Sequence, residues 1–297
     1  MKIAYLILCH IDPIHVTRLA NKLSTKNTDI FIHVDIECDI EQFKSELKYK
    51  KNVYFIDKRV KAYWGGFSAI EAIMNTIMFS KKVNEYDRYV LLQGLDYPIV
   101  SNKTIEEFFK NNSDIEFIRG CNITLSKNKK LYSKCKMYWF FDKKNFWKKC
   151  INRLNKISGI KIRRGYVSLE NKKYYIYWGA AQWALTNECI NYIVEFYKNN
   201  KKVNKYFKHV FPVDETYFHS IIFNSKFSKK TLKGGPEKEN CELVNWRNIH
   251  YFEYPNLIRV FNENDYKFLK KQKCLFIRKT TTKESTELLN LIDLDTK

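Results

Sequence analysis

Two adjacent carboxylates, Asp214 and Glu215, lie in an apolar and aromatic stretch between Pro212 and Ser220. Partial burial raises the pKa of a carboxyl group and makes its carboxylate a better proton acceptor. A general base that removes the proton of a sugar hydroxyl needs such a group. The pair is equally typical of a helix N-terminus, where Asp214 would cap the helix and Glu215 would favour the helix dipole. The pair alone does not decide between these interpretations.

The composition describes a strongly basic, folded protein. The formal net charge of the 297 residues is +21, and lysines occur along almost the whole chain. This favours anionic partners, namely nucleic acid, acidic lipid or phosphorylated small molecules, although a merely solvated basic surface has the same composition. With 45% apolar residues, the chain can bury the core of one domain or of two close lobes.

Two features indicate a reducing compartment and no membrane span. The eight cysteines include no CxxC pair, which is typical of free thiols in the cytoplasm. The apolar N-terminal stretch 1–8 is too short to cross a bilayer and lacks the cleavage site of a signal peptide. We therefore expect a first β-strand here and a cytoplasmic protein.

Strand and helix patterns alternate along the first part of the chain, which predicts an α/β fold with a mostly parallel sheet. The predicted strands are 2–9, 30–34, 53–56, 89–92, 114–118 and 174–178, and the predicted helices are 12–23, 67–80, 104–110, 187–198 and one from 214, with a short terminal piece at 288–295. Asp35 and Asp96 follow two of these strands, where such sheets bind ligands. Either carboxylate can hold a ribose or a base edge, or can simply form a turn.

Residues 126–173 are rich in Lys and Arg with aromatic residues between them. One helical face would carry the apolar side chains and the rest of the helix the basic ones; the apolar set is Phe146, Trp147, Ile151, Leu154 and Ile157, and the basic set is Lys148, Lys149, Arg153 and Lys156. This pattern is typical of an amphipathic helix on anionic lipid. It is about as typical of a surface helix that covers the core.

The common phosphate and metal motifs are missing from the sequence. It contains no GxGxxG, no GxxxxGK[ST] and no HExxH. Its one DxD, Asp293-Leu294-Asp295, lies at the extreme C-terminus, and we interpret it as terminal decoration without a metal role. The phosphates of a bound nucleotide would then need side-chain cations, for which Arg278 and Lys279 are candidates.

Seven short motifs occur in a recognisable order. They are Ile3-Ala4-Tyr5-Leu6-Ile7, His33-Val34-Asp35, Tyr63-Trp64-Gly65-Gly66-Phe67-Ser68, Leu91-Leu92-Gln93-Gly94-Leu95-Asp96-Tyr97-Pro98, Trp178-Gly179-Ala180-Ala181-Gln182-Trp183, Asp214-Glu215-Thr216-Tyr217-Phe218-His219-Ser220 and Phe276-Ile277-Arg278-Lys279. In this series the chain resembles the core-2/I-branching β-1,6-N-acetylglucosaminyltransferase and peptide O-xylosyltransferase family, glycosyltransferase family 14. The resemblance covers nearly the whole chain, least well at 121–173, and we expect a bacterial member.

The resemblance implies a GT-A-like, Rossmann-type mixed sheet flanked by helices, in a single domain 1–297 with a basic insertion. A nucleotide-binding half would comprise 1–120, a basic variable segment 121–173 and an acceptor and catalytic half 174–297. The implied reaction is an inverting, metal-independent transfer from a UDP-sugar, with GlcNAc or xylose as the favoured sugar. No cofactor beyond the UDP-sugar substrate is implied.

The resemblance also implies roles where the motifs match. Glu215 is the expected catalytic base, Asp35 contacts uridine, and Lys279 binds the donor diphosphate. Asp96 lies where the donor and acceptor sugars meet. Trp64, Gln182, Trp183 and Asp214 are further candidates for the acceptor or donor sugar, and Asp214 could instead be the cap that orients Glu215.

This sequence departs from the family pattern in three places. Gln93 replaces a serine, and Trp178 and Ala180 alter the motif before Gln182. Branching enzymes of the family also use an arginine upstream of the late lysine. Asn256 stands at that place here, so either Arg259 or Arg278 is expected to supply the charge.

We therefore expect a UDP-sugar-dependent glycosyltransferase of surface polysaccharide biosynthesis, acting on a saccharide or lipid-linked glycan acceptor. Peripheral contact with the anionic inner face of the membrane is part of this expectation. Two alternatives are a basic protein that binds single-stranded nucleic acid and a non-catalytic sugar-binding relative. No RRM, KH or zinc pattern accompanies the basic charge, so we expect no nucleic-acid partner.

Overall fold

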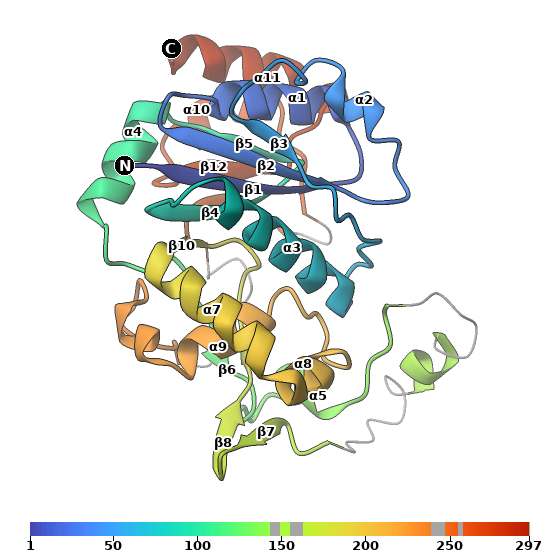
Figure 1. The fold of residues 1–297 in the computed structure, drawn as a ribbon. Helices are drawn as coiled ribbons and strands as arrows, with labels where there is room; N and C mark the ends of the chain where they lie inside the picture. Colours follow the sequence, from blue (N-terminus) through green and yellow to red (C-terminus); the bar gives the residue numbers. More distant parts are fainter. Residues whose placement is uncertain (143–148, 155–162, 239–246, 255–257, 297) are drawn as a thin grey trace.

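The computed structural model describes residues 1–142, 149–154, 163–238, 247–254 and 258–296. Its centre is a five-stranded sheet in the order β10-β4-β1-β2-β3, in which only β10 is antiparallel (Figure 1). The strands are β1 (Ile3–Cys9), β2 (Thr28–Val34), β3 (Val53–Phe55), β4 (Arg88–Gln93) and β10 (Ala184–Thr186). The four parallel strands therefore direct their carboxyl ends to one edge of the sheet.

Helices cover both faces of this sheet, as the alternation along β1 requires. Ala4 and Leu6 pack into one core with α3 (Phe67–Val83), α7 (Asn187–Asn199) and α9 (Tyr217–Phe223). Tyr5 and Ile7 pack into the other core with α1 (Pro13–Leu23), α4 (Asn102–Asn111) and α11 (Thr282–Asp295). The predicted mixed α/β class is confirmed, and the arrangement is consistent with a GT-A-like fold.

A second sheet joins the end of the chain to its first part. Its order is β11-β12-β5, with β11 (His250–Phe252), β12 (Phe276–Arg278) and β5 (Asp96–Pro98). The register places Arg278 opposite Asp96. The described residues from 250 onward thus pack with residues 1–120, whereas most of the described residues between them form the lower part of Figure 1.

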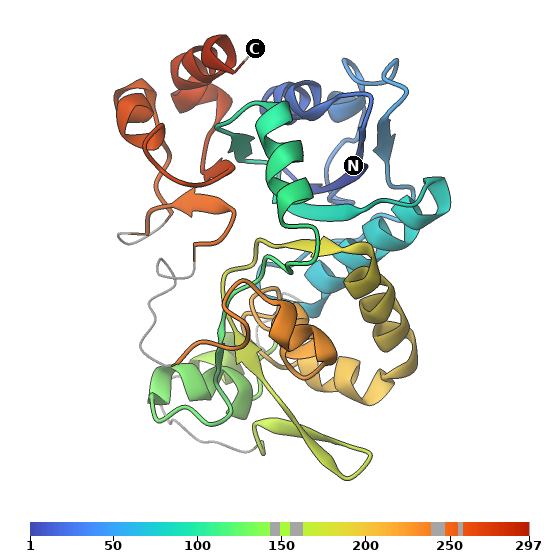
Figure 2. The same ribbon diagram turned by 90° about the vertical axis from the view of Figure 1, so that its left-hand side faces the viewer.

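The lower part contains two small antiparallel sheets and the remaining helices (Figures 1 and 2). β6 (Cys121–Asn122) pairs with β9 (Tyr177–Trp178), and β7 (Tyr166–Leu169) pairs with β8 (Lys172–Tyr175). The other short elements are α2 (Glu41–Lys44), α5 (Lys129–Lys136), α8 (Lys201–Phe207), α10 (Tyr266–Leu269) and the 3₁₀ helices η1 (Lys226–Lys230) and η3 (Glu263–Asp265). None of the helices in the described ranges is long and apolar enough to cross a membrane.

Most predicted elements are present, and four differ. Residues 114–118 form no strand but two isolated bridges, Glu116 with Thr231 and Phe117 with Ala184. The predicted strand 174–178 is two strands, because β8 and β9 pair with different partners on either side of Ile176. The terminal piece is the long helix α11, and α9 begins only at Tyr217.

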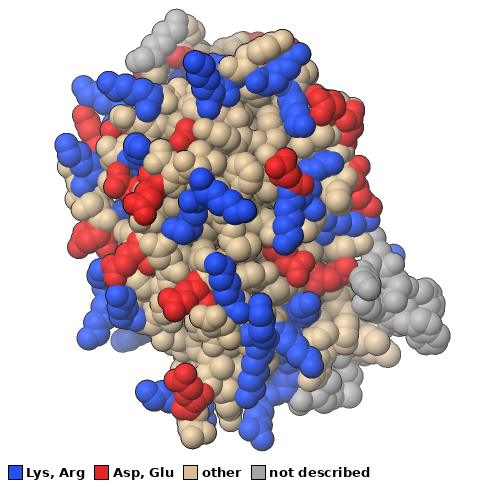
Figure 3. Space-filling model, viewed as in Figure 1, with Lys and Arg blue, Asp and Glu red and all other residues tan. Residues whose placement is uncertain are grey.

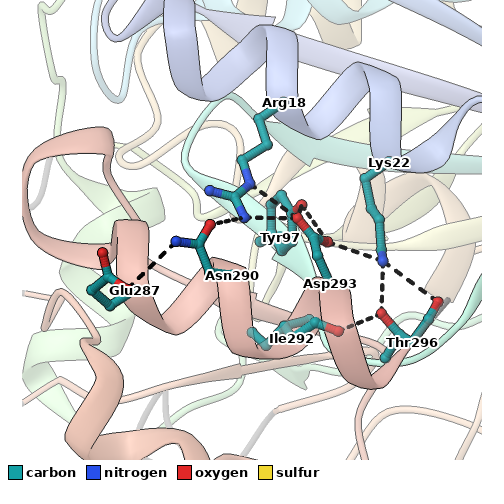
Figure 4. Close-up of polar contacts among 8 residues, drawn as sticks. All are labelled: Arg18, Lys22, Tyr97, Glu287, Asn290, Ile292, Asp293 and Thr296. Carbon is teal, nitrogen blue, oxygen red and sulfur yellow. Dashed lines mark hydrogen bonds and ion pairs between the residues drawn. The ribbon is translucent and has the colours of Figure 1, made fainter.

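The carboxylate of Asp293 joins the C-terminal helix α11 to α1, where Arg18 also donates to Asn290 and Lys22 to Thr296 (Figure 4). Arg18 donates to the Asp293 carboxylate at 2.7 and 3.1 Å, the Lys22 ammonium lies 3.0 Å away, and the Tyr97 hydroxyl donates at 2.8 Å. The interpretation of Asp293 as terminal decoration is therefore wrong, because this side chain joins α1, β5 and α11. Since α11 directly follows Lys279-Thr280-Thr281, the contact also fixes that segment.

Asp293→Ala should lower the free energy of unfolding by about 2–3 kcal/mol, because several charge-assisted hydrogen bonds are lost together. Urea unfolding would measure this. Asp295→Ala is the matched control on the same helix. Its exposed pair with Lys270, at 2.7 Å, should contribute less than about 1 kcal/mol. Equal losses in both variants would contradict the anchoring role of Asp293.

Candidate functional site

A cavity of about 430 Å³ opens at the carboxyl ends of β1, β2 and β4. Three predicted site residues from distant motifs line it together: Asp35, Trp64 and Asp214. Its other walls are formed by Leu8, Cys9, His10, His33, Glu37, Cys38, Lys61, Ala62, Tyr63, Gly65, Ala69, Ile73, Leu91, Gln93 and Ala181. The cavity is mostly apolar with a few polar groups, as small-molecule sites usually are.

On the β2 side of the cavity, the carboxylate of Asp35 holds the loop that forms the neighbouring wall. One oxygen accepts from the Glu37 backbone N–H at 2.9 Å, and the other accepts from the Ala62 N–H at 2.8 Å. His33 accepts from the Val60 N–H at 3.0 Å. The His33-Val34-Asp35 motif therefore shapes the loop that leads into Tyr63-Trp64.

An aromatic wall adjoins this loop. Trp64 is 76% exposed, and its ring packs edge to face against Phe211 at 5.0 Å and Phe141 at 6.3 Å. Gly65 has φ +71°, and a Cβ there would lie 2.4 Å from the Phe211 ring, so only glycine fits. Exposed aromatic rings of this kind suit the apolar face of a sugar ring.

Glu215 lies beside Asp214, just before α9, where two contacts fix it. The Trp178 indole N–H donates to its carboxylate at 2.6 Å, and the Gly179 N–H donates to its backbone carbonyl at 3.0 Å. A Cβ on Gly179 would lie 1.9 Å from the Arg119 carbonyl oxygen, so this approach requires glycine. Thr216 holds the cap position of α9, which makes the prediction of Asp214 as the helix cap wrong.

Many protein atoms surround the carboxylates of Asp214 and Glu215, although both side chains keep some accessible surface. Burial and the neighbouring Asp214 raise the pKa of Glu215 to about 7, while Lys134 and the Trp178 hydrogen bond oppose the rise. Burial also raises the pKa of Asp214. Glu215 therefore has the proton affinity that a base working near neutral pH needs.

Lys134 of α5 is a described cation of the basic segment whose charge acts on both carboxylates of this pair. Its ammonium lies 4.5 Å from the centre of the Trp178 ring, on the residue that also donates to Glu215. Burial lowers the pKa of Lys134, and the charges of Glu215 and Asp214 raise it. The sequence did not single out Lys134 or give Trp178 a role, because neither position is marked by a motif or by local spacing.

Asp96 is fully buried, and its carboxylate has polar partners inside the protein. It accepts from the Arg278 guanidinium at 2.8 Å and the Gln93 N–H at 2.7 Å, and His250 lies 3.2 Å away. Burial alone would raise the pKa of Asp96, but Arg278 and His250 lower it to about 2. The structure thus gives Asp96 no surface for a sugar, contrary to the prediction, and makes it the partner that holds Arg278.

Lys279, next to this ion pair, is half-buried. Its ammonium forms no hydrogen bond or ion pair with any side chain in the described ranges. Burial and the adjacent Arg278 lower its pKa. Its backbone N–H donates to the Arg259 carbonyl at 3.1 Å, and its own carbonyl accepts from Phe261. Lys279 therefore presents an unneutralised positive charge on a fixed backbone.

Arg259 and Arg278 differ from Lys279 in being neutralised. Arg259 pairs with Glu253 at 2.9 Å and with Asp265 at 2.6 Å, whereas Arg278 pairs with Asp96. Asn256 lies outside the described residues. Neither arginine offers the free charge expected from the sequence, although the field of Arg278 reaches Asp214.

The Gln-Trp motif is placed differently from the expectation. Trp183 is 0% exposed and packs on Phe218 in the core, so its predicted contact with a sugar is wrong. An aromatic residue on an apolar strand edge gives no sequence signal that separates the two roles. Gln182 is also buried, and Ala181 is the residue of this motif that reaches the cavity.

Within the described parts of the chain, no three His, Cys, Asp or Glu residues are grouped so that they could hold a metal ion. Most of the predicted amphipathic helix falls outside the described residues, including Phe146, Trp147 and Ile157.

The profile of the Core-2/I-Branching enzyme family matches residues 3–270. The chain belongs to this family, which is a class of glycosyltransferase. It is 20% identical over 225 residues to xylosyltransferase sqv-6 of Caenorhabditis elegans, a match that covers 73% of this chain and 25% of that protein. The chain thus spans about a quarter of the length of this curated relative.

A crystal structure from Bacillus anthracis, assigned as a glucose-1-phosphate thymidylyltransferase in complex with a sucrose, is also similar. It shares 14% identity and has a TM-score of 0.31, with 69% of this chain and 81% of that chain covered. A TM-score of this size does not establish a shared fold. The family profile therefore carries the assignment.

Glu215→Gln should stabilise the protein at alkaline pH. A carboxyl group with a raised pKa in the folded state makes that state lose stability as pH rises from the ordinary glutamate range to the raised pKa. The melting temperature of the variant should exceed that of the wild type by a few degrees at about pH 8 and match it at about pH 4.

Differential scanning fluorimetry across this pH range would measure the effect. Glu188→Gln is the control, because the pKa of Glu188 is lowered by its hydrogen bonds to Lys226 and Lys230. A gain in the control, or no gain in Glu215→Gln, would show that Glu215 is not held with a raised pKa.

Proposed function

We propose that the protein transfers a sugar from a UDP-sugar to a saccharide acceptor with inversion, with Glu215 as the general base. The observation that carries the proposal is the partly buried Glu215 carboxylate, which accepts a hydrogen bond from Trp178 and directly follows Asp214 of the cavity wall. An inverting transfer is a single in-line displacement. It needs one base for the incoming hydroxyl and a positive environment for the departing diphosphate.

In this proposal Lys279 meets the diphosphate and Arg278 contributes its field from the ion pair with Asp96. A carboxylate base and fixed cations can perform the displacement without a metal ion. The apolar cavity at the strand ends would take the uridine, with Asp35 at its edge, and Trp64 would lie against a sugar ring. The donor sugar, for which GlcNAc and xylose are the candidates, depends on the shape of this cavity.

The name of the Caenorhabditis elegans relative supports xylose as one donor to test. The acceptor in this proposal is a saccharide or a lipid-linked glycan of a surface polysaccharide. An enzyme with this acceptor would work at the inner face of a membrane.

Glu215→Gln should reduce sugar transfer by about 10²–10⁴-fold while UDP binding stays the same, because general-base help is lost and the donor contacts remain. UDP release from a panel of UDP-sugars, measured with and without EDTA, tests the reaction and its metal dependence. Lys279→Met should weaken donor binding and slow transfer together. Loss of activity in EDTA, or full activity of Glu215→Gln, would contradict the mechanism.

Trp178→Phe and Lys134→Met should each move the acidic limb of the kcat/KM profile to higher pH. Both residues favour the ionised form of Glu215, so their removal raises its pKa, and more alkali is needed to generate the base. Activity should fall most at about pH 6.5 and recover at about pH 8.5. Lys130→Met, on the exposed side of α5, is the control and should leave the profile unchanged.

A uniform loss of activity at every pH in Trp178→Phe would instead assign Trp178 a purely structural role. The Glu215→Gln and Trp178→Phe double variant separates the two cases. If Trp178 acts through Glu215, the double variant should be no slower than Glu215→Gln alone.

A further inference from the structure

A second cavity of about 490 Å³ lies between β7 and α8, apart from the one at the strand ends. Its lining includes Arg163, Arg164, Lys202, Lys205 and His209, and none of its lining residues is acidic. The rest of the wall is Tyr138, Tyr166, Val167, Ser168 and Tyr206. Figure 3 shows a band of Lys and Arg side chains down the lower half of the face on which Figure 1 places α8 and β7. We call this cavity the basic cleft.

Arg163 forms the floor of the basic cleft and is fixed by the backbone. Its guanidinium donates to the carbonyls of Tyr206 and His209 at 2.7 Å each, at the end of α8, and its Cζ atom lies 3.7 Å from the Tyr206 ring centre. Carbonyl groups at a helix end offset part of its charge. Burial lowers the pKa of Arg163, and the groups that oppose this are tyrosines and a cysteine, not carboxylates.

The other three cations leave the cleft with uncompensated charge. The side chains of Arg164, Lys202 and Lys205 make no hydrogen bond or ion pair with another side chain in the described ranges. Elsewhere on the surface, Lys226 and Lys230 share Glu188, and Lys270 has Asp295. Lys202 and Lys205 are three residues apart on α8, where like charges repel. An anion in the cleft would remove this repulsion.

We propose that the basic cleft binds a phosphate-bearing group, with a pyrophosphate as the best match for its several cations. Arg164 can bind phosphate oxygens with two N–H groups, and Lys202 and Lys205 can add point charges. Tyr166 and Ser168 offer hydroxyl donors on the β7 side. A lone carboxylate would leave most of this charge unmatched.

The basic cleft is joined to the cavity at the strand ends through one aromatic cluster. The Trp139 backbone N–H donates to the His209 carbonyl at 3.2 Å, and the Trp139 ring packs on Phe211 at 5.4 Å. Phe211 in turn packs on Trp64 at the cavity wall. An acceptor with its sugar against Trp64 and its phosphate in the cleft is one source of the ligand, and a lipid headgroup is the other.

The test uses the full chain saturated with UDP, so that the cations near Lys279 are already occupied. Titration calorimetry with inorganic pyrophosphate gives the affinity of the basic cleft. Lys202→Ala with Lys205→Ala should weaken pyrophosphate binding at least tenfold. The control, Lys267→Ala with Lys271→Ala near α10, removes the same charge and should bind as the wild type does. The melting temperature checks that both variants fold.

Flotation with vesicles separates the two sources. If vesicles containing phosphatidic acid retain the wild type but not the Lys202 and Lys205 double variant, the group is a lipid headgroup. If pyrophosphate binds and these vesicles do not, the ligand of the basic cleft is a soluble or glycan-linked phosphate. Equal losses in both double variants, no pyrophosphate binding in the presence of UDP, or preferential binding of single-stranded RNA over pyrophosphate at this cleft would overturn the proposal. These results do not depend on whether sugar transfer occurs.

Discussion

The hydrogen bond from the Trp178 indole to the Glu215 carboxylate is the interaction on which the site depends. Two adjacent carboxylates in partial burial repel each other and lose hydration, so both prefer to be protonated. The indole N–H and the charge of Lys134 oppose that preference without neutralising Glu215 completely. A full salt bridge would have lowered the pKa of Glu215 and weakened it as a base. The structure therefore supports the carboxylate with one neutral donor and one cation that contacts the same indole ring.

The position of the Arg278-Lys279 segment is set by contacts between the two ends of the chain. β12 pairs with β5, and Asp12 accepts from the Thr282 N–H at 2.7 Å just after Lys279. His15 joins the Gly94 carbonyl to the Thr280 hydroxyl, at 2.9 and 2.8 Å. Together with Asp293, these contacts hold the Arg278-Lys279 segment against the first strands. Long-range pairing thus fixes a late basic dipeptide beside β5, which directly follows β4.

The sequence could predict what depends on local pattern. The capped helix α1, with Asp12 at the cap and Pro13 in the first turn, is confirmed, as are the buried parallel strands whose ends carry Asp35. It could not predict that Asp96 would form an ion pair with Arg278, because this pair joins residues 182 positions apart. Trp183 and Trp178 illustrate the same limit. Both are buried tryptophans in one motif, yet the Trp178 indole donates to Glu215, whereas Trp183 packs on Phe218 in the core.

The proposed chemistry is supported less by the net charge than by which cations have carboxylate partners and which have none. A net charge of +21 implies little by itself, since many surface lysines are solvated or paired. Arg259 and Arg278 have carboxylate partners, so their charges are largely balanced before any ligand arrives. Lys279 has none among the described side chains, and the pKa of its ammonium is lowered because burial and Arg278 disfavour its charge. In the proposed reaction, a diphosphate placed there would relieve that cost, and the relief would increase as negative charge develops on the leaving oxygen. An unpaired cation that becomes better matched during the reaction stabilises the transition state more than the substrate, as catalysis requires.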